Sequence, residues 1–162
     1  MTSLYKNSFL VSLISSVGAL FFVLIAQFGF NLLPCVLCVY QRWPYAFVIL
    51  VSLLGLVFAK KLGEKLFQFL IALGFATTAV IGAFHVGVEQ GWWEGLTGCV
   101  ADTSQSQSLA ELKAQILSAP LIKCDEIAWE LFGVSMAGYN VLLALALAIF
   151  MVSAMLRRNA RL

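Results

Sequence analysis

The chain has 162 residues, of which 62% are hydrophobic and only 11% are charged, and its formal net charge is +2. Soluble domains carry about 25% charged residues, so this chain has too few charges to cover a water-facing surface. The composition excludes an ordinary soluble domain and favours a single membrane domain over residues 1–162, because the hydrocarbon core requires no polar surface.

Four stretches contain no Asp, Glu, Lys or Arg: residues 9–30, 43–59, 66–88 and 131–156. A helix needs about 20 residues to cross a bilayer, with roughly 17 to 25 tolerated, so the four stretches are long enough. The first is too long for a signal peptide, and no small-residue cleavage site follows it. The sequence predicts an all-α membrane protein, a bundle of four transmembrane helices over about 9–30, 40–59, 66–88 and 133–156.

Charged residues divide unevenly between the two ends of these helices. One side carries seven basic residues and one acidic residue, and the other carries three basic and seven acidic residues. The seven basic residues are Lys6, Lys60, Lys61, Lys65, Arg157, Arg158 and Arg161. Because Lys and Arg favour the cytoplasmic side, both termini are predicted to be cytoplasmic, with loops of about 31–39 and 89–132 outside.

All four cysteines, Cys35, Cys38, Cys99 and Cys124, fall in the two outer loops. Disulfides persist outside the cytosol, so this placement permits sulfur redox chemistry. The second loop is long, and its residues 109–117 have the apolar spacing of a short amphipathic helix that could lie along the membrane surface.

The segment Pro34-Cys35-Val36-Leu37-Cys38 stands where the first outer loop enters the second helix. Proline is favoured at the first helical position, so Pro34 is predicted to begin the helix, with the two cysteines one turn apart. Unpaired amides at a helix start stabilise a thiolate, which predicts lowered cysteine pKa values. Arg42 lies four residues beyond Cys38, on the same helical face, where its cation could hold a thiolate or a ligand oxygen.

Other interpretations of these residues remain open from the sequence. Two cysteines at this spacing are also half of a zinc site, but zinc needs four ligands, and the single His85 lies within a predicted helix. No metal site is therefore expected. Cys99 and Cys124 could form a static disulfide that braces the loop, and Arg42 could be an interfacial anchor.

The chain resembles the disulfide bond formation protein B family of bacterial inner-membrane quinone reductases. The resemblance rests on Pro34-Cys35-Val36-Leu37-Cys38-Val39-Tyr40-Gln41-Arg42, on the two cysteines of the second loop, and on Trp129-Glu130-Leu131-Phe132-Gly133 leading to Met136. It covers nearly the whole chain.

The resemblance implies a relay of two cysteine pairs. Cys99 and Cys124 would exchange disulfides with a soluble periplasmic thioredoxin-fold oxidase of the DsbA type, and Cys35 and Cys38 would re-oxidise them. Cys38 beside Arg42 would pass two electrons to ubiquinone or menaquinone from the membrane pool.

The resemblance also implies residues of the quinone pocket. Met136 matches a residue that lines this pocket. In some members a histidine follows the glutamate that matches Glu89; that position is Gln90 here, and His85 is one turn earlier. Both His85 and Gln90 are therefore candidates for contact with the quinone. Lipid is the other expected partner, and no nucleic acid is expected.

Of three alternatives, one shares the quinone chemistry and two belong to other classes of protein. A vitamin K epoxide reductase-like quinone reductase carries its active pair later in the helical domain. A tetraspanin-like structural or adaptor protein would use its cysteines only to brace the outer loop, but the Cys-Cys-Gly signature is absent. A metal transporter would show carboxylates within its helices, and the four apolar stretches contain none.

Overall fold

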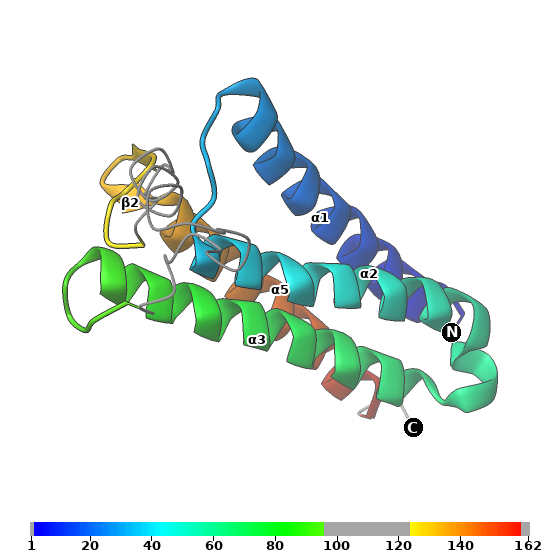
Figure 1. Ribbon diagram of the computed structural model, residues 1–162. Helices are drawn as coiled ribbons and strands as arrows, with labels where there is room; N and C mark the ends of the chain where they lie inside the picture. The colour runs from blue at the N-terminus through cyan, green and yellow to red at the C-terminus, as the bar shows by residue number, and fades with distance from the viewer. Residues whose placement is uncertain (1, 96–123, 160–162) are drawn as a thin grey trace, which may run out of the picture.

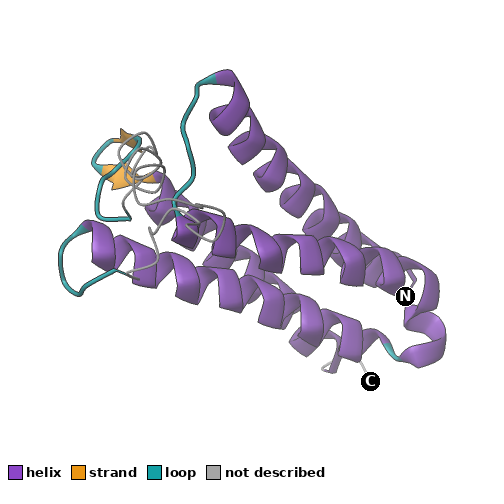
Figure 2. Ribbon diagram, in the orientation of Figure 1, coloured by secondary structure: helices purple, strands orange, loops and turns teal. Residues whose placement is uncertain are grey.

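A computed structural model describes residues 2–95 and 124–159. The elements are α1 (Thr2–Gly29), α2 (Val36–Leu62), α3 (Glu64–Glu89), β1 (Glu130–Leu131), β2 (Val134–Ser135) and α5 (Met136–Asn159) (Figures 1 and 2). Each of the four helices contains a segment long and apolar enough to cross a membrane, so the predicted all-α fold is confirmed and the chain is a multi-pass membrane protein. The predicted amphipathic helix over 109–117 lies outside the described residues.

Three helix starts differ from the prediction by three residues or more, and the first is that of α1, which begins at Thr2 rather than near residue 9. Helix α2 begins at Val36 rather than near residue 40, because Cys35 has an extended backbone and caps the helix by accepting the Cys38 N–H through its sulfur. Pro34 therefore precedes the cap and is not the first helical residue. Helix α5 begins at Met136 rather than near residue 133, because the preceding residues pair as a short hairpin.

The helices pack around an apolar core. Helix α3 packs most extensively against α5 and α2, and α1 packs mainly against α2. The buried core residues are Phe9, Tyr45, Val48, Val51, Ala59, Phe67, Ile71, Phe75, Leu147 and Met151. Large apolar side chains also cover the outer faces, as with Phe21, Val57 and Val80, each more than 60% exposed. Such faces would be unfavourable in water and are suited to contact with lipid.

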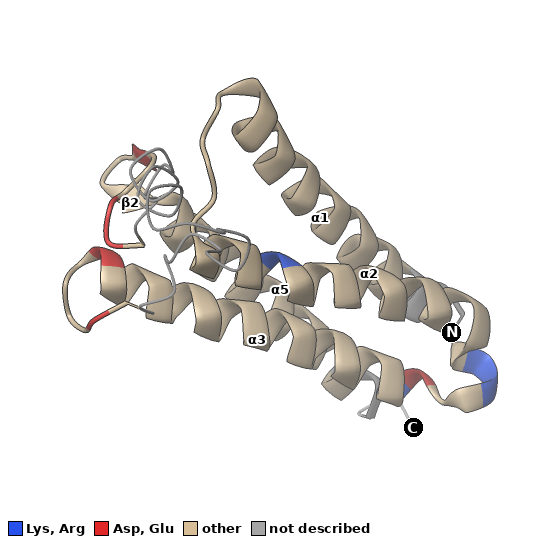
Figure 3. Cartoon of the chain, in the orientation of Figure 1, with Lys and Arg blue, Asp and Glu red and all other residues tan. Residues whose placement is uncertain are grey.

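The two ends of the bundle differ in charge. Figure 1 places both termini at the end that also holds the α2–α3 turn. The last turn of α2 carries Lys60 and Lys61, and the acidic residues at the opposite end are seen in red in Figure 3. The cysteine-bearing connection from α1 to α2 also lies at this opposite end.

Gly74 allows α3 to pack against α2. A Cβ atom there would lie 2.6 Å from Val48 Cγ2 and 3.3 Å from Phe47 Cδ1, both on α2. We therefore expect Gly74→Ala to lower the free energy of unfolding by about 1–3 kcal/mol, as over-packing of a core does. Gly18→Ala is the matched control, because a Cβ at Gly18 meets no atom within 4 Å. Thermal unfolding in detergent, followed by tryptophan fluorescence, measures both; equal midpoints for the two variants would contradict the prediction.

Candidate functional site

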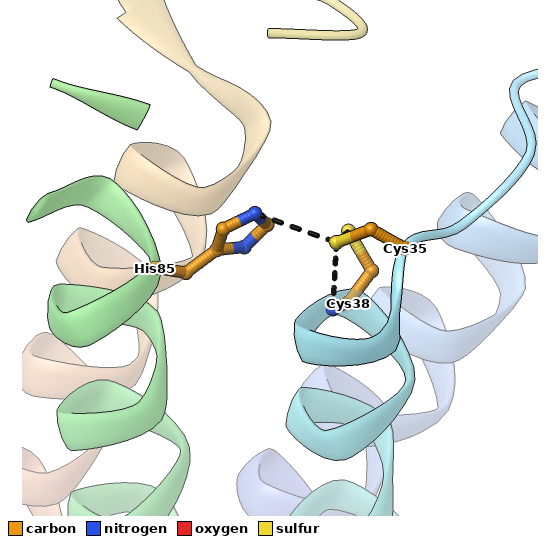
Figure 4. A group of neighbouring side chains, drawn as sticks. All are labelled: Cys35, Cys38 and His85. Atoms are coloured by element: carbon orange, nitrogen blue, oxygen red, sulfur yellow. Dashed lines mark hydrogen bonds between the residues drawn. The ribbon is translucent and has the colours of Figure 1, made fainter. Parts of the chain in front are cut away.

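Cys35 and Cys38 lie together at the start of α2. Cys35 is the N-cap and Cys38 is in the first turn, so their sulfur atoms approach to 3.2 Å, and the Cys35 thiol donates to Cys38 Sγ (Figure 4). The Cys35 sulfur also accepts the Cys38 backbone N–H at 3.3 Å. The predicted proximity of the two cysteines is confirmed, and a small side-chain rotation would bring the sulfurs to bonding distance.

The Cys35 thiol holds its proton tightly. Its hydrogen bond to Cys38 and its burial raise the pKa of Cys35 from 9.0 to about 12, although the contact with His85 acts in the opposite direction. The expectation that the helix start lowers the pKa is wrong for Cys35, because the thiol donates its proton to a neighbouring sulfur and is only 6% exposed.

The raised pKa of Cys35 predicts its reactivity in the reduced protein. Only the thiolate is alkylated, so the rate at Cys35 is expected to rise about tenfold per pH unit beyond pH 9, up to its pKa of about 12. Mass spectrometry of the Cys35 peptide after timed treatment with iodoacetamide measures this rate. In Cys38→Ala the main cause of the shift is lost, and the rate should level off at lower pH. A plateau near pH 9 in the unaltered protein would contradict the prediction.

Cys124, from the second loop, packs against this pair. It is 5% exposed and belongs to a buried cluster with Cys35, Leu37 and Val88. Burial raises the pKa of the Cys124 thiol, although hydrogen bonds from the backbone of Leu37 and Val36 oppose this effect. One predicted loop cysteine is therefore beside the helix-capping pair, and Cys99 lies outside the described residues.

His85, on α3, faces Cys35 across the helix interface. Its Nε2 atom lies 3.5 Å from Cys35 Sγ (Figure 4). The same atom lies 3.7 Å from Glu89 Oε1, and Nδ1 lies 2.9 Å from Gln41 Nε2. The ring is buried, and Glu89 in turn accepts a hydrogen bond from the Ser135 hydroxyl. His85 therefore contacts one sulfur of the cysteine pair directly.

The ligand atoms of Cys35, Cys38 and His85 lie within 4.8 Å of one another. The sequence places His85 within a helix, and in the structure this helix brings the ring to the cysteines. Two sulfurs and one imidazole suit a divalent cation such as zinc. Structural zinc takes four ligands, however, and this cluster supplies three among the residues that the structure describes.

A cavity of about 290 Å³ adjoins the cysteines, where α1 diverges from the other helices (Figure 1). Its lining comes from all four helices and both outer connections: Val23, Ala26, Leu32, Leu33, Pro34, Cys35, Cys38, Arg42, His85, Glu89, Glu126, Ile127, Ala128, Trp129, Met136 and Ala137. Arg42 reaches the cavity from α2 and donates to Gln27 Oε1 of α1 at 2.7 Å. Apolar walls with a few charged groups are typical of sites for small ligands.

A two-stranded hairpin lies between Trp129 and Met136, which both line this cavity. β1 pairs with β2 in antiparallel register, and the turn residues Phe132 and Gly133 both have positive φ, the conformation that suits a two-residue hairpin turn. Ser135 ties the hairpin to Glu89 at the end of α3, and Met136 N–H donates to the Trp129 carbonyl. These bonds hold Met136 and Trp129 at the cavity.

The structure brings together most of the residues singled out from sequence. Cys35, Cys38, Arg42, His85 and Met136 line the cavity. Gln90 does not; it caps the end of α3, where its N–H donates to the Val86 carbonyl.

Sequence reasoning assigned no role to Glu89, Gln41 and Asn140, which surround His85 directly or through one further hydrogen bond. For Gln41 and Asn140 a signal was present, because polar side chains at membrane depth are rare and often functional.

These features define a class: a multi-pass membrane protein with a close Cys-x-x-Cys pair beside a cavity at one end of its bundle. Comparison with known sequences gives the family. The profile described as disulfide bond formation protein DsbB matches residues 5–154, so the chain belongs to this family. Family membership implies that the chain acts in disulfide bond formation, as an oxidoreductase.

Individual relatives align with this chain over most of their own length. An uncharacterized protein of Rickettsia prowazekii is 32% identical over 149 residues, 91% of this chain and 86% of the relative. Disulfide bond formation protein B of Methylobacillus flagellatus is 25% identical, over 91% of this chain and 90% of its own. The protein of that name from Xanthomonas oryzae pv. oryzae is 24% identical, over 93% of this chain and 90% of its own length. No solved structure matches the chain.

Proposed function

We propose that this chain oxidises a periplasmic thioredoxin-fold dithiol oxidase of the DsbA type and passes the two electrons to membrane quinone, either ubiquinone or menaquinone. The observation that carries the proposal is the contact of the Cys35–Cys38 pair with a largely apolar cavity that also contains Arg42 and His85. Family membership favours this function over the bracing and vitamin K epoxide reductase-like alternatives.

The residues of the cavity fit a quinone ring. Such a ring is planar and apolar on its faces, and its two carbonyl oxygens accept hydrogen bonds. Arg42 carries several N–H donors, and Val23, Ala26 and Leu33 supply apolar walls. Arg42 is held in place by Gln27, so its guanidinium is ordered before any ligand arrives. Met136, at the start of α5, completes the wall on the hairpin side.

The proposed relay begins with disulfide exchange in the outer loops. A thiolate of the soluble donor attacks the Cys99–Cys124 disulfide, and the second donor thiol completes its oxidation. The dithiol so formed then reduces the Cys35–Cys38 disulfide, and the buried contact of Cys124 with Cys35 supports this transfer. Quinone, when bound, accepts the two electrons and two protons that the donor dithiol has lost.

The proposed location is the bacterial inner membrane, with both termini in the cytoplasm and the cysteines on the periplasmic side. The charge difference between the two ends of the bundle supports this orientation, because Lys60 and Lys61 lie at the end that holds the termini. Disulfide exchange with a secreted partner requires the cysteine end to face outward.

The experiment is a turnover assay with the purified chain in detergent. A reduced thioredoxin-fold donor is added with ubiquinone-1 or menadione, and donor thiols and quinone absorbance are followed together. We expect thiol oxidation that requires quinone and stops when quinone is exhausted. Thiol oxidation at the same rate without quinone, or none with either quinone, would refute the proposed function.

A further inference from the structure

A chain of hydrogen bonds inside the bundle ends on His85. The Tyr45 hydroxyl donates to Asn140 Oδ1 at 2.7 Å, and Asn140 Nδ2 donates to Gln41 Oε1 at 2.6 Å. Gln41 Nε2 then lies 2.9 Å from His85 Nδ1. Three helices supply these side chains: α2 supplies Tyr45 and Gln41, α3 supplies His85, and α5 supplies Asn140.

The direction of this chain is fixed by two contacts with groups of known polarity. The Leu37 carbonyl can only accept, and the Gln41 amide atom that faces it at 3.2 Å must therefore be the nitrogen. Thr78 donates its hydroxyl hydrogen to the Gln41 backbone carbonyl at 3.0 Å. Its oxygen is left to accept from Asn140 Nδ2 at 3.3 Å, which fixes the Asn140 amide as well.

The same polarity determines the tautomer of His85. Gln41 Nε2 has two hydrogens, one for the Leu37 carbonyl and one for His85 Nδ1. Nδ1 must then accept, and a neutral ring that accepts at Nδ1 carries its hydrogen on Nε2. Nε2 is the atom that faces Cys35 Sγ and Glu89 Oε1. Cys35 donates its own hydrogen to Cys38, so its sulfur accepts from His85 rather than donating to it.

We propose that Gln41 is a positioning residue that fixes His85 as the Nε2–H tautomer, with this N–H directed at the Cys35 sulfur. The effect of this tautomer on catalysis rests on the proposed function; the tautomer itself does not. The N–H stabilises negative charge on Cys35 whenever the Cys35–Cys38 bond is opened. A protonated Nε2 also has no lone pair for a metal, so the cluster of two cysteines and one histidine is left with two ligands.

Gly82 on α3 makes room for this network. A Cβ atom at Gly82 would lie 3.2 Å from both Asn140 Nδ2 and Gln41 Oε1, and 2.8 Å from Val141 Cγ2. The close approach of α3 to the amides of α2 and α5 therefore depends on glycine at this position.

The tautomer can be measured directly because His85 is the only histidine in the chain. Purified by a tag without histidine and labelled with ¹⁵N-histidine, the chain gives one imidazole, whose Nδ1 and Nε2 signals report which nitrogen carries hydrogen. The expected result is the Nε2–H form. The Nδ1–H form in the unaltered protein would overturn the proposal, whether or not the chain reduces quinone.

Two glutamine variants separate positioning from general effects on the fold. Gln41→Met removes the donor to Nδ1 at similar length, so the Nε2–H signature should give way to a mixture of forms, and turnover should fall roughly 10-fold. Gln68→Met is the control, since Gln68 is also buried but bonds to Ser8 instead of His85. An unchanged tautomer in Gln41→Met would overturn the proposal. An equal loss of the Nε2–H signature in Gln41→Met and Gln68→Met would also overturn it.

Discussion

Cys38→Ala is expected to lower quinone-dependent oxidation of the protein donor by about 1,000-fold or more, as removal of an essential nucleophile does. Without the Cys38 sulfur, which lies 3.2 Å from Cys35 Sγ, the Cys35–Cys38 disulfide beside the cavity cannot form. A single cysteine cannot cycle between a disulfide and a dithiol, so electrons from the outer loop do not reach the cavity. The steady-state rate of quinone bleaching with a thioredoxin-fold donor measures the effect.

The control for this prediction is Cys124→Ala, which interrupts the relay one step earlier. It should also abolish oxidation of the protein donor, but a small dithiol such as dithiothreitol could still reduce the Cys35–Cys38 pair and support quinone bleaching. Cys38→Ala should lose both activities. Residual activity above about one tenth in Cys38→Ala would remove Cys38 from its proposed role, because redox nucleophiles are not dispensable to that degree.

Arg42→Met should raise the KM for quinone by about 10- to 100-fold, the effect of losing one hydrogen bond from a charged donor. Arg42 lines the cavity and is already held by Gln27, so its guanidinium is ordered for a carbonyl oxygen without a further loss of side-chain freedom. Arg42→Lys should recover only part of the affinity, because an ammonium group lacks the planar fork of donors. Titration of initial rates against ubiquinone-1 gives KM and kcat separately.

Lys61→Met is the matched control for the loss of positive charge. Lys61 lies in the last turn of the same helix, at the opposite end from the cavity. It should leave the KM for quinone unchanged within about twofold, because charges farther apart than the Debye length of about 8 Å are largely screened at exposed sites. An equal rise in KM for both variants would mean that net charge, rather than the position of Arg42, governs affinity.

The helices could be predicted from the sequence because the lipid environment requires each apolar segment to satisfy its own backbone hydrogen bonds. Apolar runs free of charge, such as residues 66–88, must be helical in lipid, and α3 was found at Glu64–Glu89. The start of α2 was missed because hydropathy does not detect a capping cysteine. The hairpin before α5 was missed because two-residue strands such as Glu130–Leu131 carry no periodic signal.

The site could be predicted only in part. Cys35, Cys38 and Arg42 are close in sequence, and helical spacing was enough to bring them together. The surroundings of His85 depend on how α2, α3 and α5 pack, and no local pattern gives that packing. The lowered pKa expected for Cys35 was wrong, because the hydrogen bond that its thiol donates to Cys38 and its burial outweigh the helix start.

The most direct test of the proposed electron path is a single-turnover reaction without oxygen. The chain is purified with all its cysteines oxidised and one equivalent of ubiquinone, and is then mixed with one equivalent of the reduced thioredoxin-fold donor. We expect that one quinone is reduced for each donor disulfide formed, and that the Cys35–Cys38 pair is oxidised again at the end. Donor oxidation that leaves the quinone unchanged and these two cysteines reduced would contradict it.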